Sequence, residues 1–194
     1  MLLILGERNH QYCATTHPPP IAATSDGVIL YLSRTSCGKA VKTEWFQDYK
    51  TPSLYIAFPN CSFKCEKECG KKMCQNSHLA SLPEKDIGID VIMRKYLSNP
   101  VTQAIVCGGL EPFDDFHEVI SFVSAVRSWY DCNDTIVIYT GYNPEEIETE
   151  INLLKQYDNI IVKFGRYIPN QTPHYDEVLG VKLASDNQFA VKIS

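Results

Sequence analysis

The chain has 194 residues, 44% of them hydrophobic and 21% charged, so it is long enough for one domain with a substantial core and too apolar to be disordered. Its formal net charge of -5 argues against a general nucleic-acid-binding protein, which needs a clustered excess of lysine and arginine. The first apolar run is shorter than the core of a signal peptide and no later run approaches a membrane span, so we expect a cytoplasmic protein with no membrane segment.

Residues 1–50 differ in pattern from the rest of the chain. The stretch HPPP at 17–20 breaks any regular element, and two β-type runs, 27–34 and 38–46, flank a turn rich in Ser, Cys and Gly. We therefore predict an N-terminal β-hairpin extension over residues 1–50, followed by the main domain over residues 51–194.

From residue 53, short β-branched runs alternate with segments of helical period. This alternation predicts an α/β fold in which right-handed βαβ units build a parallel sheet. The segments that follow the strands, NCSFKCEKEC, GGLEPF, TGY and GRYIPN, then lie at one edge of the sheet, where such folds bind ligands. We expect strands at 53–58, 103–107, 135–139 and 159–164, and helices at 87–97, 114–130 and 144–157.

The loop after the first of these strands carries Cys61, Cys65, Cys69 and Cys74. In a reducing cytoplasm such a cluster of thiols indicates metal binding or catalysis more than disulfides. Structural zinc usually takes two short-spaced pairs from separate chain segments, whereas an iron–sulfur cluster accepts ligands from one compact loop. The spacing therefore favours a cluster, with zinc and four unliganded thiols as the alternatives.

Read in order, five segments resemble the radical S-adenosylmethionine (SAM) superfamily and, within it, the activating enzymes of anaerobic ribonucleotide reductases. CSFKC is similar to the superfamily's opening C-x3-C with an aromatic inside it, and GGLEP to its GGEP with one leucine inserted. YTGY resembles W-T-G-Y of the activating enzymes, KFGRY corresponds loosely to their D-G-x-F without its acid, and LASDNQ is similar to G-S-S-N-Q. The resemblance covers about residues 53 to 190.

The resemblance implies a shortened parallel β/α barrel and a [4Fe-4S] cluster held by three cysteines, whose fourth iron binds SAM. Cys61 and Cys65 match the first two ligands. The third departs from the superfamily's C-x2-C spacing: Asn76 close behind Cys74 favours that cysteine, whereas regular spacing favours Cys69.

The resemblance also implies a set of SAM-binding residues around the cluster. Glu111 is expected to pair with the methionyl ammonium and Arg166 with the carboxylate, because opposite charges strengthen such hydrogen bonds. No side chain is assigned a catalytic role. The predicted SAM-binding residues are Phe63, Asn76, Gly108, Gly109, Glu111, Pro112, Thr140, Gly141, Tyr142 and Arg166.

The implied function is an oxidoreductase that cleaves SAM to a 5′-deoxyadenosyl radical and activates a glycyl-radical partner, such as an anaerobic ribonucleotide reductase. An electron donor such as flavodoxin or ferredoxin would reduce the cluster. Two alternatives stay open: a radical SAM enzyme that modifies a small molecule or peptide, and a non-catalytic interaction module that binds zinc or an iron–sulfur cluster.

Overall fold

The computed structural model describes residues 34–35, 40–44, 46–81 and 87–194, all within the unit from Leu32 to Ser194. The first predicted strand of the N-terminal hairpin, residues 27–34, lies almost wholly outside the described residues. The second is present as β2 (Ala40–Glu44), which pairs antiparallel with β3 (Ser53–Phe58) of the main sheet. A two-residue strand, β1 (Arg34–Thr35), pairs with β4 (Ile87–Gly88).

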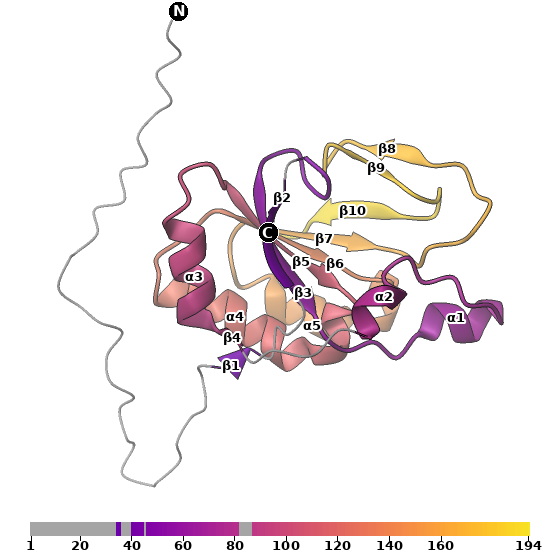
Figure 1. Ribbon diagram of the computed structural model, residues 1–194, viewed down its shortest axis with the longest axis horizontal. Coiled ribbons are helices and arrows are strands. Elements are labelled where there is room, and N and C mark those ends of the chain that lie inside the picture. The colour runs from indigo at the N-terminus through magenta and orange to yellow at the C-terminus, as the bar shows by residue number, and fades with distance from the viewer. Residues whose placement is uncertain (1–33, 36–39, 45, 82–86) are drawn as a thin grey trace, which may run out of the picture. The chain divides into compact units, whose positions relative to one another are not determined.

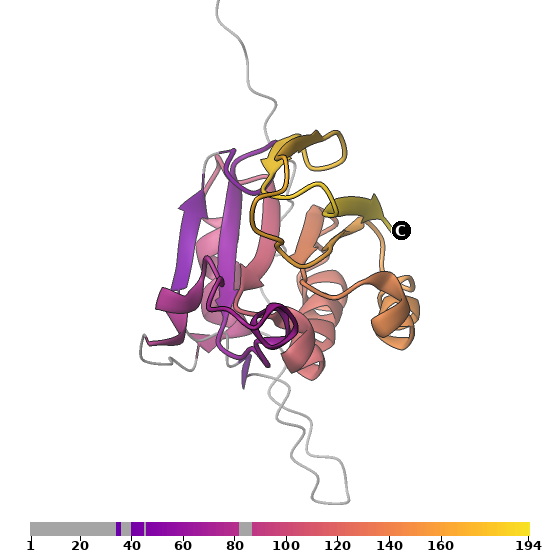
Figure 2. The same ribbon diagram turned by 90° about the vertical axis from the view of Figure 1, so that its right-hand side faces the viewer.

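The centre of the fold is a six-stranded, mostly parallel sheet in the order β10-β7-β6-β5-β3-β2 (Figure 1). Its four inner strands are parallel and follow one another in chain order, as predicted. The outer strands β2 and β10 run antiparallel to their neighbours and form the two edges (Figure 2). Within the described residues the sheet is open. The remaining strands of the sheet are β5 (Ala104–Gly109), β6 (Thr135–Tyr139), β7 (Ile160–Phe164) and β10 (Phe189–Lys192).

Three helices cover one face of this sheet (Figure 1): α3 (Ile89–Leu97), α4 (Phe116–Ser128) and α5 (Glu148–Leu154). All three predicted helices are therefore confirmed, but each starts later than predicted, and the second and third also end earlier. The second and third begin as 3-10 turns, η1 (Pro112–Asp115) and η2 (Pro144–Glu146). Proline suits a first turn because its missing N–H would have no helical partner there. No helix in the described part of the chain has the length and apolarity to cross a bilayer.

Alternating side chains of the strands form two cores. Ile56, Ile138 and Val162 pack with the helices, whereas Val106 and Ile161 belong to a second core on the opposite face. The hairpin of β8 (His174–Asp176) and β9 (Val181–Leu183) contributes to that second core. Because both faces are covered, the carboxyl ends of the strands are the part of the sheet left for a ligand.

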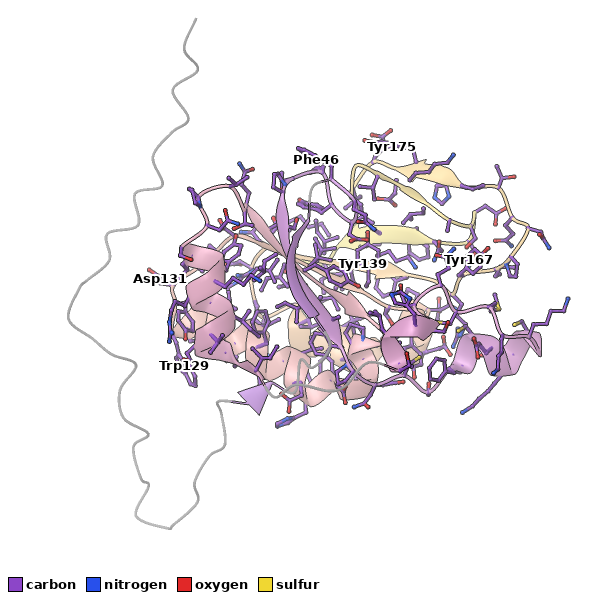
Figure 3. All side chains as sticks on the ribbon, in the orientation of Figure 1. Phe46, Trp129, Asp131, Tyr139, Tyr167 and Tyr175 are labelled. Atoms are coloured by element: carbon purple, nitrogen blue, oxygen red, sulfur yellow. The ribbon has the colours of Figure 1, made fainter. Side chains whose placement is uncertain are left out.

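The segment after β3 lies at this carboxyl-terminal end and carries two short helices, α1 (Lys64–Cys69) and α2 (Ser77–Ala80) (Figure 1). Tyr167, which follows β7, lies toward the same end of the sheet (Figure 3). Trp129 and Asp131, which follow α4, lie at the opposite end (Figure 3). The four loops singled out in the sequence therefore belong to one end of the fold.

Candidate functional site

Hydrogen bonds between neighbouring loops hold the strand ends together. The Glu111 N–H donates to the Asn60 carbonyl at 2.8 Å, which joins the loops after β5 and β3. The Gly165 N–H donates to the Tyr142 carbonyl at 3.1 Å, which joins the loops after β7 and β6. The predicted meeting of these loops at one edge is confirmed.

The four cysteines of the loop after β3 do not share one environment. Cys61, Cys65 and Cys74 are half-buried, whereas Cys69 is exposed. The Cys69 Sγ lies 3.3 Å from the Lys71 carbonyl of its own loop. Cys69 thus differs from the other three in burial and in its contacts.

The three half-buried thiols also affect one another electrostatically. Burial raises the pKa of Cys61 to about 12, and the nearby Cys65 contributes to that rise. Burial also raises the pKa of Cys65, and Cys74 is the next largest cause. The pKa of Cys74 is raised by burial as well. These thiols are protonated without a metal, and a bound metal would have to displace their protons.

The described residues include no group of three or more His, Cys, Asp or Glu that is placed to hold one metal ion. A structural zinc site needs all its ligands to converge on a single centre. A cluster makes a different demand, because each thiolate binds a different iron. Three half-buried thiols on one loop fit that demand.

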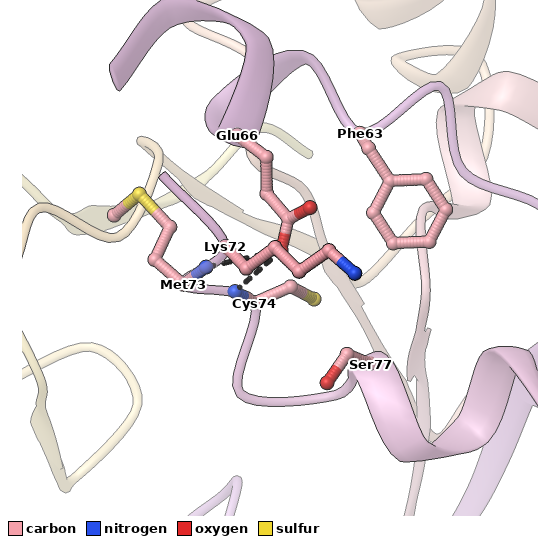
Figure 4. Close-up of a pocket in the computed structure, with 6 residues that line it drawn as sticks. All are labelled: Phe63, Glu66, Lys72, Met73, Cys74 and Ser77. Carbon is pink, nitrogen blue, oxygen red and sulfur yellow. Dashed lines mark hydrogen bonds between the residues drawn. The ribbon is translucent and has the colours of Figure 1, made fainter. Parts of the chain in front are cut away.

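Glu66 links the first turn of α1 to the backbone at Cys74. Its carboxylate Oε1 accepts the N–H groups of Met73 and Cys74, each at 3.0 Å (Figure 4). Two residues further on, the Asn76 Nδ2 donates to the Gly109 carbonyl at 2.9 Å. The backbone at Cys74 is therefore held on one side by Glu66 of α1 and on the other by the hydrogen bond from Asn76 to the end of β5.

Asp114 fixes the segment next to Cys61. One of its carboxylate oxygens accepts the Ser62 N–H, and the other accepts the Tyr142 hydroxyl at 2.6 Å. One carboxylate in η1 thereby connects the cysteine loop with the loop after β6.

An ion-pair network connects α1 to the other strand ends. The Lys64 ammonium pairs with Glu146, which also accepts two hydrogen bonds of 2.7 Å from the Arg166 guanidinium. Hydrogen bonding from Arg166 holds the pKa of Glu146 well below its usual range. The Arg166 Nε lies 3.2 Å from Glu68. Arg166, expected from the resemblance to meet SAM's carboxylate, is thus paired with two carboxylates of the protein.

Glu111 is 6% exposed and connects the loops after β5 and β6. Its carboxylate accepts the Thr140 hydroxyl at 2.7 Å, the Gly141 N–H at 2.8 Å and the Phe113 N–H at 3.2 Å. Burial raises the pKa of Glu111 to about 7, although these three donors oppose the rise. A carboxyl group poised near neutrality beside the cysteine loop responds strongly to a nearby cation.

Two hollows adjoin the cysteines. The smaller has a volume of about 30 Å³ and brings Cys61 and Cys65 together with the strand-end loops. The larger, about 500 Å³, is bordered by the cysteine loop itself (Figure 4). The small hollow is lined by Cys61, Ser62, Lys64, Cys65, Glu111, Gly141, Tyr142 and Arg166. The large one is lined by Phe63, Glu66, Lys72, Met73, Cys74 and Ser77.

The structure places the predicted site residues unevenly around these hollows. Glu111, Gly141, Tyr142 and Arg166 lie at the small hollow, and Phe63 lies at the large one. The other predicted residues line neither hollow. Asn76 donates a hydrogen bond to the Gly109 carbonyl, and Thr140 donates one to the Glu111 carboxylate. Pro112 begins η1, and Gly108 lies next to the Tyr55 side chain.

Sequence reasoning missed several residues that organise the site. Glu66, Asp114 and Glu146 support the cysteine loop, but the sequence does not identify their partners. Lys163 is a fourth case: it is 5% exposed and donates from Nζ to the Gly165 carbonyl at 2.8 Å. Burial lowers the pKa of Lys163 to about 8, and the charge of Glu111 opposes the change. A lone lysine inside the apolar run NIIVKF was the signal available for it.

The two glycines that end β5, Gly108 and Gly109, differ in the atoms that an added Cβ would meet. Gly109 has a φ of 94°, and a Cβ there would lie 2.8 Å from backbone atoms of Ala57 and Phe58. At Gly108 the nearest atom would be the mobile end of the Tyr55 side chain, at 2.7 Å.

We expect Gly109→Ala to lower the free energy of unfolding by about 2–5 kcal/mol, because backbone strain adds to overpacking. Gly108→Ala is expected to cost about 1 kcal/mol, since a side-chain tip can shift. Urea unfolding of the two variants measures the difference, and equal losses would contradict it.

A comparison with protein families places these features in context. The model of a family described as a 4Fe-4S single cluster domain matches residues 52–188. The match includes the cysteine loop, the four parallel strands and the loops that follow them. Searches of curated proteins and of solved structures found no match.

Proposed function

The chain belongs to the 4Fe-4S single cluster domain family, and from that premise we propose that it binds a [4Fe-4S] cluster through Cys61, Cys65 and Cys74 and uses it to cleave SAM. One observation carries the proposal. Cys61, Cys65 and Cys74 are half-buried and close enough to raise one another's pKa, Cys65 acting on Cys61 and Cys74 on Cys65, whereas Cys69, the last residue of α1, is exposed. Three ligands leave one iron free for SAM.

The residues around the cysteines suit SAM as well as a cluster. In our proposal Glu111 accepts the methionyl ammonium, and Gly141 presents its backbone beside that carboxylate. Phe63 at the large hollow and Tyr142 at the small hollow offer aromatic rings. Arg166 would meet SAM's carboxylate by exchanging one of its pairs with Glu146 or Glu68. A ligand of SAM's size needs the small hollow, of about 30 Å³, to widen.

When bound, the cluster and SAM supply the chemistry: one electron breaks the sulfonium's carbon–sulfur bond and gives methionine and a 5′-deoxyadenosyl radical. The protein's residues hold both groups and exclude water. We propose that the sheet is a shortened version of the radical SAM barrel and that the radical serves a glycyl-radical partner. A cytoplasmic location agrees with the thiols' need for a reducing compartment.

Anoxic reconstitution followed by iron and sulfide analysis and a SAM cleavage assay tests the proposal. We expect about four irons per chain and release of 5′-deoxyadenosine on reduction. Zinc in the loop, or a cluster with no cleavage of SAM, would instead support a non-catalytic module. Cleavage without a glycyl radical on a reductase would indicate a small molecule or a peptide as substrate.

Binding of SAM to the loaded protein is expected to release up to about half a proton at pH 7, because an ammonium beside Glu111 favours its ionised form. Calorimetry in buffers with different heats of ionisation measures this release. The Glu111→Gln variant, which lacks this carboxyl group, should release about half a proton less than the native protein. A heat of binding that is independent of the buffer in the native protein would contradict contact between Glu111 and the ammonium.

A further inference from the structure

The cysteine loop exposes positive charge on a protein whose net charge is -5. Lys67, Lys71 and Lys72 lie within six residues of one another, and all three are exposed. Within the described residues none of the three lysine side chains forms an ion pair or a hydrogen bond. We call these three residues the lysine cluster.

The acidic residues of the same loop do not neutralise the lysine cluster. Glu66 accepts two backbone N–H groups, and Glu68 pairs with Arg166. In the sequence KCEKECGKK, alternating charges suggest a balanced, solvated loop. The structure instead engages both glutamates in contacts with the protein and leaves the lysines available to a partner.

The lysine cluster adjoins the large hollow of about 500 Å³. Lys72 lines it, and its side chain extends across the hollow toward Phe63 (Figure 4). Met73 and Cys74 supply a less polar wall, and Cys74 is one of the proposed cluster ligands. A molecule seated in the hollow would therefore touch a residue bonded to the cluster.

Resting on the proposed function, we propose that the lysine cluster and the large hollow form the docking surface for an acidic electron-donor protein. One electron passes from the donor's reduced flavin or iron–sulfur centre to the cluster held by Cys61, Cys65 and Cys74. The donor is oxidised by one electron, and no bond or proton moves in this step. Opposite charges speed such encounters, and interfaces between redox proteins are small, so three exposed lysines, one of which lines the hollow, suffice.

The test compares two triple variants of the loaded protein. In the first, Lys67, Lys71 and Lys72 are replaced by glutamate. In the control, glutamate replaces Lys155, Lys182 and Lys192, which are exposed lysines outside the loop and give the same change in net charge. Stopped-flow absorbance follows cluster reduction by flavodoxin hydroquinone and, in a separate arm, by reduced ferredoxin.

We expect the loop variant to react with at least one donor about tenfold or more slowly at low ionic strength, with the difference shrinking as salt is added. The control should change less than about threefold, since distant charges are screened. Reduction by dithionite should be similar in all proteins. Equal slowing in both variants, or none in the loop variant, would overturn the docking surface.

A second measurement keeps the proposal testable if the loop variant fails to load a cluster. Oxidised flavodoxin or ferredoxin is titrated into apoprotein, and the loop variant should bind about tenfold more weakly than the control. Unchanged binding, or loss of affinity for a single-stranded oligonucleotide alone, would overturn the inference. Loading and dithionite-driven cleavage report on the proposed function separately, so the failure of one is distinguishable from the failure of the other.

Discussion

Replacing Cys74 with alanine is expected to abolish cluster binding and SAM cleavage, whereas Cys69→Ala retains both. A [4Fe-4S] cluster with only two thiolate ligands lacks the third bond that holds it in the protein. Cys74 is half-buried, and its N–H is fixed by Glu66. Cys69 is exposed and contacts the carbonyl groups of its own loop. The two single variants therefore decide which cysteine is the third ligand.

Iron and sulfide content, the visible absorption of the cluster and the yield of 5′-deoxyadenosine measure the outcome. Cys132→Ala serves as a matched control, because this thiol is buried in the core on the helix side of the sheet. We expect Cys74→Ala to retain less than about a tenth of the iron, and Cys69→Ala to retain nearly all of it. The reverse result would move the third ligand to Cys69 and leave the Glu66 contact as a purely structural one.

The strands and helices of the main domain could be predicted because local patterns specify them. The run TIVIY has three apolar central residues, all of them buried, as expected for a strand covered on both faces. The edge at which the four loops meet follows from the alternation of strands and helices alone. For the same reason the cysteine loop and the Glu111 segment could be placed near each other before the structure was known.

The contacts that tie the cysteine loop to the other strand-end loops could not be predicted, because each joins residues far apart in the chain. Lys64 and Glu146 are separated by 82 positions, and Ser62 and Asp114 by 52. The local sequence marks Glu146 only as the residue three positions after the helix cap Asn143, and it does not show that Lys64 and Arg166 are its partners. The pairing of Arg166 with Glu146 and Glu68 could not be predicted for the same reason. A sequence shows that a residue is charged but does not show which residue pairs with it.

Removing the Glu111 side chain is expected to lower the free energy of unfolding by about 3 kcal/mol, because three donors lose their acceptor, two of them main-chain N–H groups. The loss also removes the hydrogen bonds that hold Thr140 and Gly141 beside the end of β5, so SAM binding should disappear in Glu111→Ala. Asp115→Ala is the control, since it removes a partly exposed carboxylate whose hydrogen bonds to Asn60 are worth less than about 1 kcal/mol. Urea unfolding and equilibrium binding of SAM measure the two effects.

The pH dependence of stability separates the charge of Glu111 from its hydrogen bonds. The folded apoprotein keeps Glu111 protonated up to about pH 7, whereas the unfolded chain ionises it above about 4.5. The unfolded state therefore loses its proton first, and Glu111 makes the fold less stable as the pH rises between these values, by on the order of 3 kcal/mol. In Glu111→Gln this contribution is absent. The free energy of unfolding of the variant should therefore rise relative to that of the native protein between pH 5 and pH 7. A constant difference between the two proteins over that range would show that Glu111 is already ionised in the fold and is held by its three donors.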